Sequence, residues 1–445
     1  MAPLVVIDVV GLTPRLLTHM PNVAKAGNAA ALRPVLPAVT CSVQATFLTG
    51  APPREHGVVG NGWYFRDLGE VLLWRQHNAL IQGEQLWGAL PGLRTANVCW
   101  WYAMGAASDI VVTPRPIYHA DGRKSPDCYT RPPSLHDDLV AALGDFPLFS
   151  YWGPGAGIAS SEWIVAAARR ILTRERPDLL MVYVPHLDYD LQRHGPDGPE
   201  AIAAARAVDA ALAPLLAEDA TFVVLSEYGI TRAARPVDVN RALRRAGLLE
   251  VHTQAGMEYL DAMASRAFAV ADHQIAHVYV RDPADVPRVR GLIAELPGVD
   301  EVLDGEGKAR YGLDHERAGE LVAVAEPDAW FTYYYWLSDD RAPDFARLVE
   351  IHRKPGYDPA ELFMDPADPF VKLRAARALV RKKLGFRYTM PVVPLDPSPV
   401  RGSHGRLPDS AADGPVLLGP FDRDSYAATE VKGLLTRLVK GESRE

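Results

Sequence analysis

The chain has 445 residues, of which 48% are hydrophobic and 23% are charged, and this composition is typical of a globular protein with a large core. Its formal net charge of -8 shows no excess of basic residues, which argues against nucleic acid as a binding partner. Cys41, Cys99 and Cys128 form no Cys-x-x-Cys pair. This spacing argues against a disulfide framework or a zinc ribbon and favours a reducing, cytoplasmic compartment.

The N-terminal stretch "LVVIDVV", residues 4–10, predicts a first strand. It does not resemble a signal peptide, because no basic region precedes it and Asp8 interrupts its apolar run. No run of about 18 apolar residues occurs elsewhere, so we expect no membrane span. The sequence gives no indication of the oligomeric state.

Short apolar runs alternate with helical patterns through the first half of the chain. Further strands are predicted at residues 95–101, 178–185 and 221–227, and helices at 160–175, with Ser160 as its N-cap, and 198–218. Continuous apolar strands between helices are typical of a sheet buried on both faces. We therefore predict an α/β fold with a mostly parallel central sheet covered by helices on both faces.

The pattern changes at about residue 240. Residues 266–280 are rich in β-branched and aromatic residues, 285–296 read as a helix, and 298–304 and 320–326 as strands, which together predict a small α+β insertion or cap. The aromatic run at 328–340 is expected to fill a core or line a pocket. A Pro-rich loop at 390–408 and a closing helix from about residue 425 complete the chain. The predicted division is a catalytic core at 1–240, an insertion at 241–389 and the C-terminal part of the core at 390–445.

Polar residues follow several of the predicted strands. Asp8 ends the first strand, Asp188 follows the strand at 178–185, and Glu227 ends the strand at 221–227. The carboxyl ends of parallel strands meet at one edge of a sheet, so these carboxylates are expected to converge there. Thr40 and, in the Pro-rich loop, His404 add a hydroxyl and an imidazole.

These residues stand in an order that resembles the alkaline phosphatase superfamily, in its nucleotide pyrophosphatase/phosphodiesterase branch. The resemblance covers the first ~230 residues and resumes at His404. It implies that Asp8 binds a metal and that Thr40, followed by "FLTGAPPREHGVVGN", is a metal-bound nucleophile. It also implies that Asn61 stabilises a phosphoryl oxygen. A phosphoryl- or nucleotidyl-enzyme intermediate would form and then be hydrolysed, with two metal ions clamping the reacting oxygens.

Three positions depart from the family pattern. Where the family has Asp-x-x-x-His-x-x-Gly-Pro, the chain has Asp188 and Gln192, and where it has Ser-Asp-His-Gly, the chain has Glu227 and Tyr228. His404 keeps its Gly-Ser-His-Gly frame. The implied ligands are therefore Asp8, Thr40, Asp188, Glu227 and His404. A neutral amide is a weak ligand and a phenol rarely binds a divalent ion at neutral pH. This oxygen-rich set therefore favours Mg²⁺, Mn²⁺ or Ca²⁺ over the zinc of the family pattern, at one or two sites.

Substitute metal or substrate ligands are sought among residues outside these motifs. Asp272 and His273 are candidates, and if residues 271–280 form a strand, His273 and His277 share one of its faces. His352 is a further candidate, and the Arg353 and Lys354 that follow it suit a phosphate. Gln192 and Tyr228 are also candidates for contacts with metal or substrate, although packing is the simpler role for Tyr228.

Each site residue has a simpler structural alternative. Asp8 could cap a helix or turn, Thr40 could cap the helix that begins beside it, and Asn61 could be a left-handed turn residue between two glycines. Asp188 and His404 could be exposed loop residues, and Glu227 could pair with an arginine such as Arg232. His273 and His352 could be buried core histidines.

Three functions remain open at the level of sequence. The first is a metal-dependent hydrolase of phosphate diesters or nucleotide pyrophosphate bonds, acting on a small phosphorylated or nucleotide substrate. The second is a phosphonate or phosphomonoester hydrolase, or a phosphomutase, on the same scaffold. The third is a binding protein that has lost its metals, which the changes at Gln192, Glu227 and Tyr228 would explain.

Overall fold

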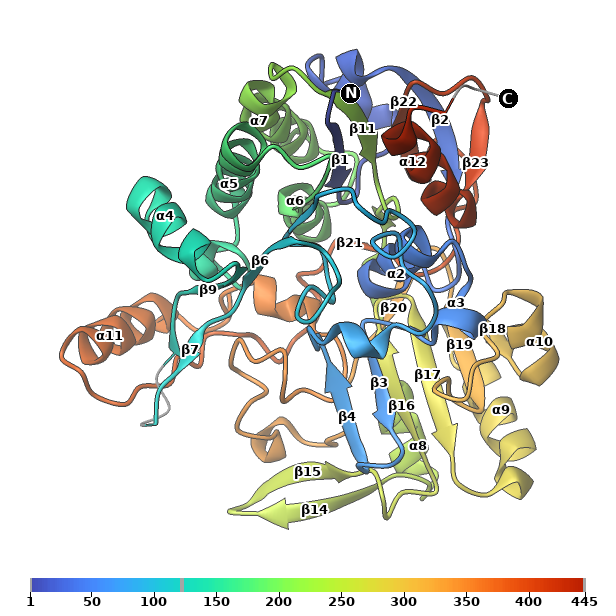
Figure 1. Cartoon of the computed structure of the whole chain (residues 1–445). Coiled ribbons are helices and arrows are strands. Elements are labelled where there is room, and N and C mark those ends of the chain that lie inside the picture. The colour runs from blue at the N-terminus through green and yellow to red at the C-terminus, as the bar shows by residue number, and fades with distance from the viewer. Residues whose placement is uncertain (1, 121–123, 443–445) are drawn as a thin grey trace.

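A nine-stranded sheet forms the centre of the computed structural model, which describes residues 2–120 and 124–442 (Figure 1). Its strand order is β23-β2-β22-β11-β1-β10-β5-β6-β9. The strands are β1 (Leu4–Val9), β2 (Asn28–Arg33), β5 (Thr95–Val98), β6 (Ile110–Pro114), β9 (Cys128–Arg131), β10 (Leu179–Val184), β11 (Thr221–Leu225), β22 (Val416–Gly419) and β23 (Ser425–Ala427). The block from β11 to β6 is parallel, whereas β22 and β9 pair antiparallel with it. This confirms the predicted α/β fold with a mostly parallel sheet.

Helices follow the strands of this sheet along the chain. They are α1 (Pro14–Leu17), α2 (Thr40–Thr49), α3 (Pro53–His56), α4 (Ser134–Leu143), α5 (Ile158–Glu175), α6 (His186–His194), α7 (Pro199–Leu216) and α12 (Val431–Lys440). Two predicted starts were wrong. Helix α5 begins before Ser160, whose hydroxyl donates to the Gly157 carbonyl. The closing helix begins at Val431, because residues 425–427 add β23 to the edge of the sheet.

A second, four-stranded sheet has the order β16-β17-β19-β18 and lies in the lower half of Figure 1. Its strands are β16 (Ala267–Asp272), β17 (Ile275–Val280), β18 (Val299–Leu303) and β19 (Leu321–Ala325). Residues 266–280 therefore form a hairpin and not one continuous strand. His273 stands at its turn with φ of 60°, so the condition under which His273 and His277 would share one face, a strand over 271–280, is not met. The turn bonds to the C-terminal loop, since Gln274 donates its N–H to the His404 carbonyl at 2.8 Å.

Short elements surround the two sheets. The strands are β3 (Gly62–Phe65), β4 (Glu70–Leu73), β7 (Ile117–Tyr118), β8 (Lys124–Ser125), β12 (Thr231–Arg232), β13 (Arg235–Val237), β14 (Glu250–Gln254), β15 (Met257–Asp261), β20 (Ala329–Phe331) and β21 (Gly402–Ser403). The helices are α8 (Val239–Arg245), α9 (Val286–Ala294), α10 (Gly305–Arg310) and α11 (Val371–Lys383). The separate core, insertion and C-terminal units predicted for this chain stay a prediction.

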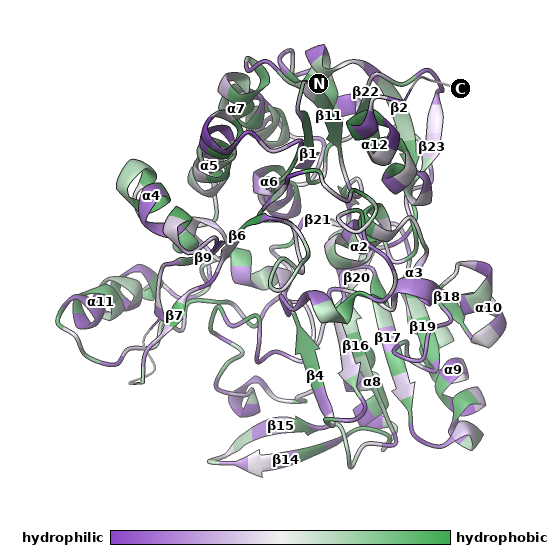
Figure 2. Cartoon of the chain, viewed as in Figure 1, coloured by the Kyte–Doolittle hydropathy of each residue, from purple (hydrophilic) through white to green (hydrophobic). Residues whose placement is uncertain are grey.

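Strands β1 and β11 are coloured as hydrophobic, whereas helices such as α5 and α12 combine hydrophobic and hydrophilic residues (Figure 2). One hydrophobic cluster surrounds the large sheet and a second surrounds the small sheet. The aromatic run Tyr333, Tyr334, Tyr335 and Trp336 is fully buried in the second cluster. Of the two roles expected for this run, the structure therefore shows the core role.

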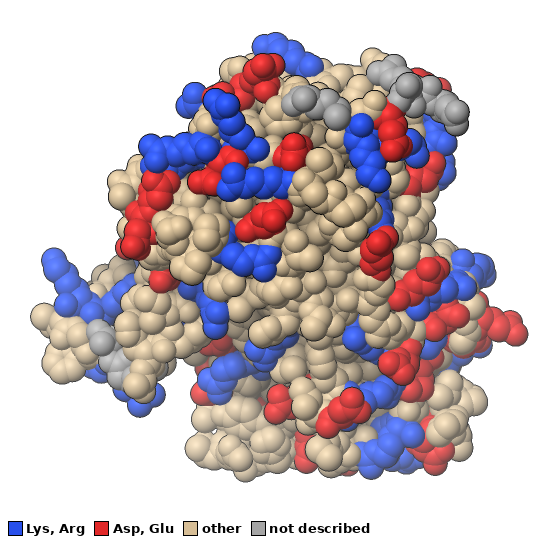
Figure 3. Space-filling model, in the orientation of Figure 1, with Lys and Arg blue, Asp and Glu red and all other residues tan. Residues whose placement is uncertain are grey.

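Charged side chains of both signs are mixed on the face of the molecule shown in Figure 3. Among residues 2–120 and 124–442, no helix is both long enough and apolar enough to cross a bilayer. Cys41, Cys99 and Cys128 are buried free thiols.

A buried ion pair anchors the segment that follows the aromatic run. The Lys354 ammonium lies 2.7 Å from the Asp358 carboxylate and 2.7 Å from the Glu361 carboxylate, and all three side chains are at most 2% exposed. Lys354 therefore does not serve as the phosphate partner that its sequence context suggests. Tyr357, in the same segment, donates its N–H to the Ala271 carbonyl of β16 at 2.9 Å. The segment is thus joined to the small sheet.

We predict that Lys354→Met destabilises the protein by about 3–5 kcal/mol, because it leaves two buried carboxylates without their cation. Arg353→Met is the matched control, since Arg353 pairs with Asp344 at the surface and such pairs are worth at most about 1 kcal/mol. Urea unfolding followed by circular dichroism measures both variants. Equal stabilities for the two would contradict the anchoring role of Lys354.

Candidate active site

Three carboxylates predicted from the strand ends meet at one edge of the large sheet. Strand β1 lies between β10 and β11, and Asp8 is in register with Tyr183 and Leu225. Asp188 lies in the first turn of α6, directly after β10, and Glu227 lies two residues after β11. The parallel arrangement brings these side chains together, as expected from the topology.

Asp8 and Glu227 form a buried pair held by Gln44. The Gln44 Nε2 donates to Asp8 Oδ2 at 3.2 Å and to Glu227 Oε1 at 2.6 Å. The Gln44 Oε1 accepts the backbone N–H of Trp101 at 2.8 Å, which directs the amide hydrogens toward the two carboxylates. The remaining oxygens, Asp8 Oδ1 and Glu227 Oε2, are buried and have no hydrogen-bond partner.

This pair carries a strong electrostatic penalty. Burial, followed by the neighbouring Glu227, raises the pKa of Asp8 well above its usual value. Burial also raises the pKa of Glu227, to about 7, although Asp8, Thr40 and Gln44 lower it in part. Neither carboxylate has an ion-pair partner among residues 2–120 and 124–442. Two buried, unpaired carboxylate oxygens fit the oxygen-rich ligand set that a divalent cation prefers.

Thr40 is the first residue of α2, and its hydroxyl does not cap that helix. The Thr40 Oγ1 lies 3.1 Å from the Tyr228 hydroxyl. The capping role considered for Thr40 is therefore not the one observed. Thr40 is only 3% exposed, so its side chain lies within the site and not on the molecular surface.

Asp188 is the centre of a second polar cluster. Gln192 Nε2 donates to Asp188 Oδ2 at 2.7 Å, and the Tyr228 hydroxyl donates to Asp188 Oδ1 at 3.3 Å. His404 Nε2 lies 3.8 Å from the same Oδ1. His404 Nδ1 is 2.9 Å from the Ala38 carbonyl, so Nδ1 donates and Nε2 carries the lone pair. Burial raises the pKa of Asp188 to about 7 and lowers that of His404 to about 3.

Four aromatic rings stack beside this cluster. Tyr228 and His404 have ring centroids 3.5 Å apart, His404 and His273 3.7 Å, and His273 and Tyr357 3.7 Å. The Tyr357 hydroxyl donates to Gln192 Oε1 at 2.9 Å, so both ends of the stack are hydrogen-bonded toward Asp188. Tyr357 belongs to no sequence motif that would identify it as a site residue. His273 contacts the site through ring stacking.

Asn61 is held next to Thr40 by three hydrogen bonds. Its N–H and its Nδ2 donate to the two oxygens of Asp272 at 2.7 and 3.0 Å, and its Oδ1 accepts from the Cys41 N–H at 3.0 Å. Both oxygens of Asp272 are therefore used to orient Asn61. Asn61 is not in the left-handed conformation considered for it. One hydrogen of its Nδ2 remains for a further acceptor.

The structure does not bring every candidate to the site. His352 Nδ1 lies 3.3 Å from the Leu73 carbonyl, and it contacts none of the three carboxylates described above. His277 Nε2 bonds to the Val59 carbonyl at 2.8 Å. Arg232 pairs with Asp197 at 3.3 Å instead of Glu227.

Gln44 is the functional residue that sequence reasoning missed. It lies four residues after Thr40 in α2, so the two side chains share one face of the helix. A glutamine one helical turn after a nucleophile is the signal that could have identified it.

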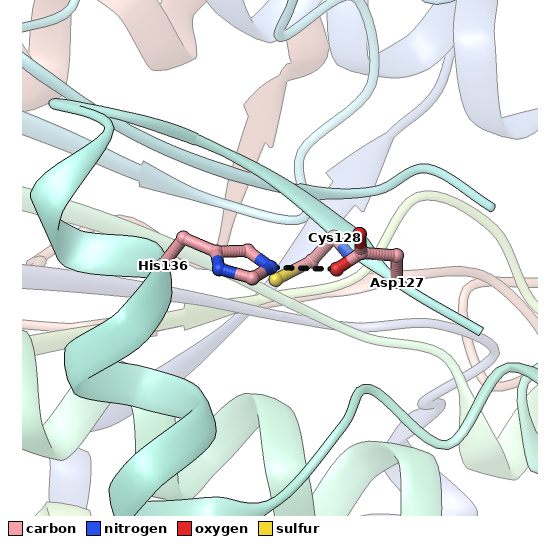
Figure 4. Close-up of side chains that lie close together, drawn as sticks. All are labelled: Asp127, Cys128 and His136. Carbon is pink, nitrogen blue, oxygen red and sulfur yellow. Dashed lines mark hydrogen bonds and ion pairs between the residues drawn. The ribbon is translucent and has the colours of Figure 1, made fainter. Parts of the chain in front are cut away.

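A separate group of side chains, of types that commonly bind metals, lies at the β9 edge of the large sheet (Figure 4). Ligand atoms of Asp127, Cys128 and His136 lie within 4.8 Å of one another. The His136 Nε2 is 2.7 Å from Asp127, and its Nδ1 is 3.0 Å from Asp137. Burial raises the pKa of the Cys128 thiol to about 12. Both ring nitrogens of His136 are thus engaged by carboxylates, and the group ties α4 to β9.

Comparison with known families gives a match over most of the chain. The model of the type I phosphodiesterase / nucleotide pyrophosphatase family matches residues 4–358. This range contains Asp8, Thr40, Asn61, Asp188 and Glu227, whereas His404 lies beyond it.

Solved structures share the fold. The phosphonoacetate hydrolase of Sinorhizobium meliloti in complex with phosphonoformate is 17% identical, with a TM-score of 0.62 over 99% of this chain and 96% of that one. Murine ectonucleotide pyrophosphatase / phosphodiesterase 5 in complex with AMP is 15% identical, with a TM-score of 0.58 over 99% and 95% of the two chains. The human counterpart is 13% identical, with a TM-score of 0.58 over the same shares of the two chains.

We predict that Asp188 and Glu227 lower the stability of the metal-free protein as the pH rises from about 5 to about 8, a contribution opposite in sign to that of buried histidines such as His56 and His404, whose pKa values burial lowers to about 3. Asp188 and Glu227 have pKa values of about 7 in the folded state and about 4 when unfolded. Between these values the folded state binds more protons than the unfolded state, so each increase in pH favours unfolding, by up to about 1.4 kcal/mol per pH unit and group.

Melting temperatures in the presence of a chelator measure this effect. The difference in melting temperature between Glu227→Gln and wild type should increase in favour of the variant as the pH rises, because the variant lacks one of the titrating carboxyls whereas the histidines are common to both proteins. A difference that stays constant over this range would show that the Glu227 carboxyl is not responsible.

Proposed function

The chain belongs to the type I phosphodiesterase / nucleotide pyrophosphatase family, and on this basis we propose that it hydrolyses a phosphate diester or a pyrophosphate bond of a small nucleotide-like substrate, with Thr40 as nucleophile. The observation that carries the proposal is the position of the Thr40 hydroxyl. It stands at the N-terminus of α2, beside the Asp8–Glu227 pair and next to the oriented amide of Asn61.

Asp8, Glu227 and Thr40 would hold one divalent cation. The unpaired oxygens of the two carboxylates and the Thr40 hydroxyl are hard ligands, so Mg²⁺ or Mn²⁺ fits them better than Zn²⁺. When bound, such a cation would favour the ionised form of the hydroxyl and neutralise charge on the phosphoryl oxygens.

The remaining chemistry follows from the side chains. Thr40 Oγ1 attacks phosphorus, the leaving group departs, and a covalent phosphoryl-threonine remains until water hydrolyses it. The proton that leaves Thr40 has a path through the Tyr228 hydroxyl to Asp188, since these groups are joined by two hydrogen bonds. The free hydrogen of Asn61 Nδ2 would stabilise charge on a phosphoryl oxygen. A helix N-terminus adds a favourable field for the anion.

We predict that Thr40→Ala lowers kcat on the preferred substrate by on the order of 10³-fold or more, because it removes the attacking oxygen. Thr40→Ser should retain measurable activity. Thr49→Ala, at the other end of α2, is the control, since the Thr49 hydroxyl bonds only within the helix and to the next loop.

The assay uses bis(p-nitrophenyl) phosphate, dinucleotide pyrophosphates and phosphonoacetate, each with Mg²⁺, Mn²⁺ or Zn²⁺. Hydrolysis of phosphonoacetate alone would favour the phosphonate alternative on the same scaffold. Turnover that survives Thr40→Ala would exclude Thr40 as the nucleophile, and the absence of turnover on every substrate would favour a binding protein.

A further inference from the structure

We propose that this site binds one divalent cation, between Asp8 and Glu227. A second cation would require the carboxylate oxygens of Asp188, and these oxygens accept hydrogen bonds from Tyr228 and Gln192. The inference rests on the proposed function and specifies its cofactor stoichiometry. It is carried by a contrast between two buried carboxylate clusters at the same edge of the sheet.

The first cluster keeps ligand atoms available. Gln44 binds one oxygen of Asp8 and one oxygen of Glu227, and the second oxygen of each carboxylate is buried without a partner. The Trp101 N–H prevents the Gln44 amide from reversing, because reversal would bring two N–H groups together. Gln44 thus orients both carboxylates while leaving one oxygen of each free.

The second cluster has no such atoms on its carboxylate. Asp188 Oδ2 accepts from Gln192 and Oδ1 accepts from Tyr228. Gln192 is held from behind by the Tyr357 hydroxyl, so its amide hydrogens face Asp188. A cation would have to share both Asp188 oxygens with these hydrogen bonds and would meet the positive end of the amide dipole.

The neighbouring His273 has a buried Nδ1 without a partner, and in the second cluster His404 leaves the lone pair of Nε2 free. The His404 ring is stacked between Tyr228 and His273 at centroid distances of 3.5 and 3.7 Å, so both of its faces are covered. Imidazole nitrogens without a free carboxylate oxygen form a poor site for Mg²⁺ or Mn²⁺, which prefer oxygen ligands. The lone pair is instead available to accept a hydrogen bond from water or substrate.

The distribution of negative charge between the two clusters also favours a single cation. The first cluster places two carboxylates in contact, and burial opposes their ionisation unless a cation compensates them. The second cluster holds a single carboxylate that accepts two hydrogen bonds. A divalent cation therefore compensates the first cluster in full, and the second cluster has no matching excess of charge.

The test is a titration of metal-free protein with Mn²⁺, followed by electron paramagnetic resonance of the free ion and by native mass spectrometry. Wild-type protein should bind one Mn²⁺ per chain. Asp8→Asn should weaken binding by at least about 10–100-fold, whereas the isosteric Asp188→Asn should leave the affinity unchanged within about twofold. Glu227→Gln and His404→Gln repeat this comparison in case either aspartate variant does not fold.

Two Mn²⁺ ions per wild-type chain, or equal losses of affinity in Asp8→Asn and Asp188→Asn, would overturn the inference. Two ions together with hydrolysis that depends on Thr40 would overturn it and leave the proposed function standing. One ion without hydrolysis of any substrate would uphold the stoichiometry and count against the proposed function.

Discussion

The hydrogen bond from the Trp101 backbone to the Gln44 side chain is the contact on which the site depends. This hydrogen bond fixes the orientation of the Gln44 amide. The amide in turn orients two carboxylates that come from different strands. Without this donor, Asp8 and Glu227 would be two buried acids with no fixed geometry. A neutral amide can hold such a pair in place without neutralising it, so the charge that attracts a cation is preserved.

Residues from distant parts of the chain close the site on its other side. Tyr228 follows the large sheet, His404 follows β21, His273 turns the hairpin of the small sheet, and Tyr357 belongs to the segment anchored by Lys354. Their rings stack in that order. The small sheet therefore contributes directly to the site, and the anchoring of Tyr357 by a buried ion pair becomes part of the geometry around Asp188.

Sequence reasoning predicted the features that depend on strand periodicity and topology. Parallel apolar strands must end at one edge, so the convergence of Asp8, Asp188 and Glu227 could be predicted. Features that depend on side-chain pairing could not. The hairpin turn at His273 lacks the glycine or asparagine that usually marks a positive φ, and Lys354 looks like an exposed cation until its two carboxylate partners are placed.

The position of β22 has a consequence for biosynthesis. This strand lies between β2 and β11 inside the large sheet, although it comes from residues 416–419. A nascent chain that has emerged only to the end of the small sheet therefore has a gap in its central sheet and lacks His404. Folding of the large sheet cannot be completed until residues 416–419 have left the ribosome, and the ring stack beside Asp188 forms only after His404 has emerged.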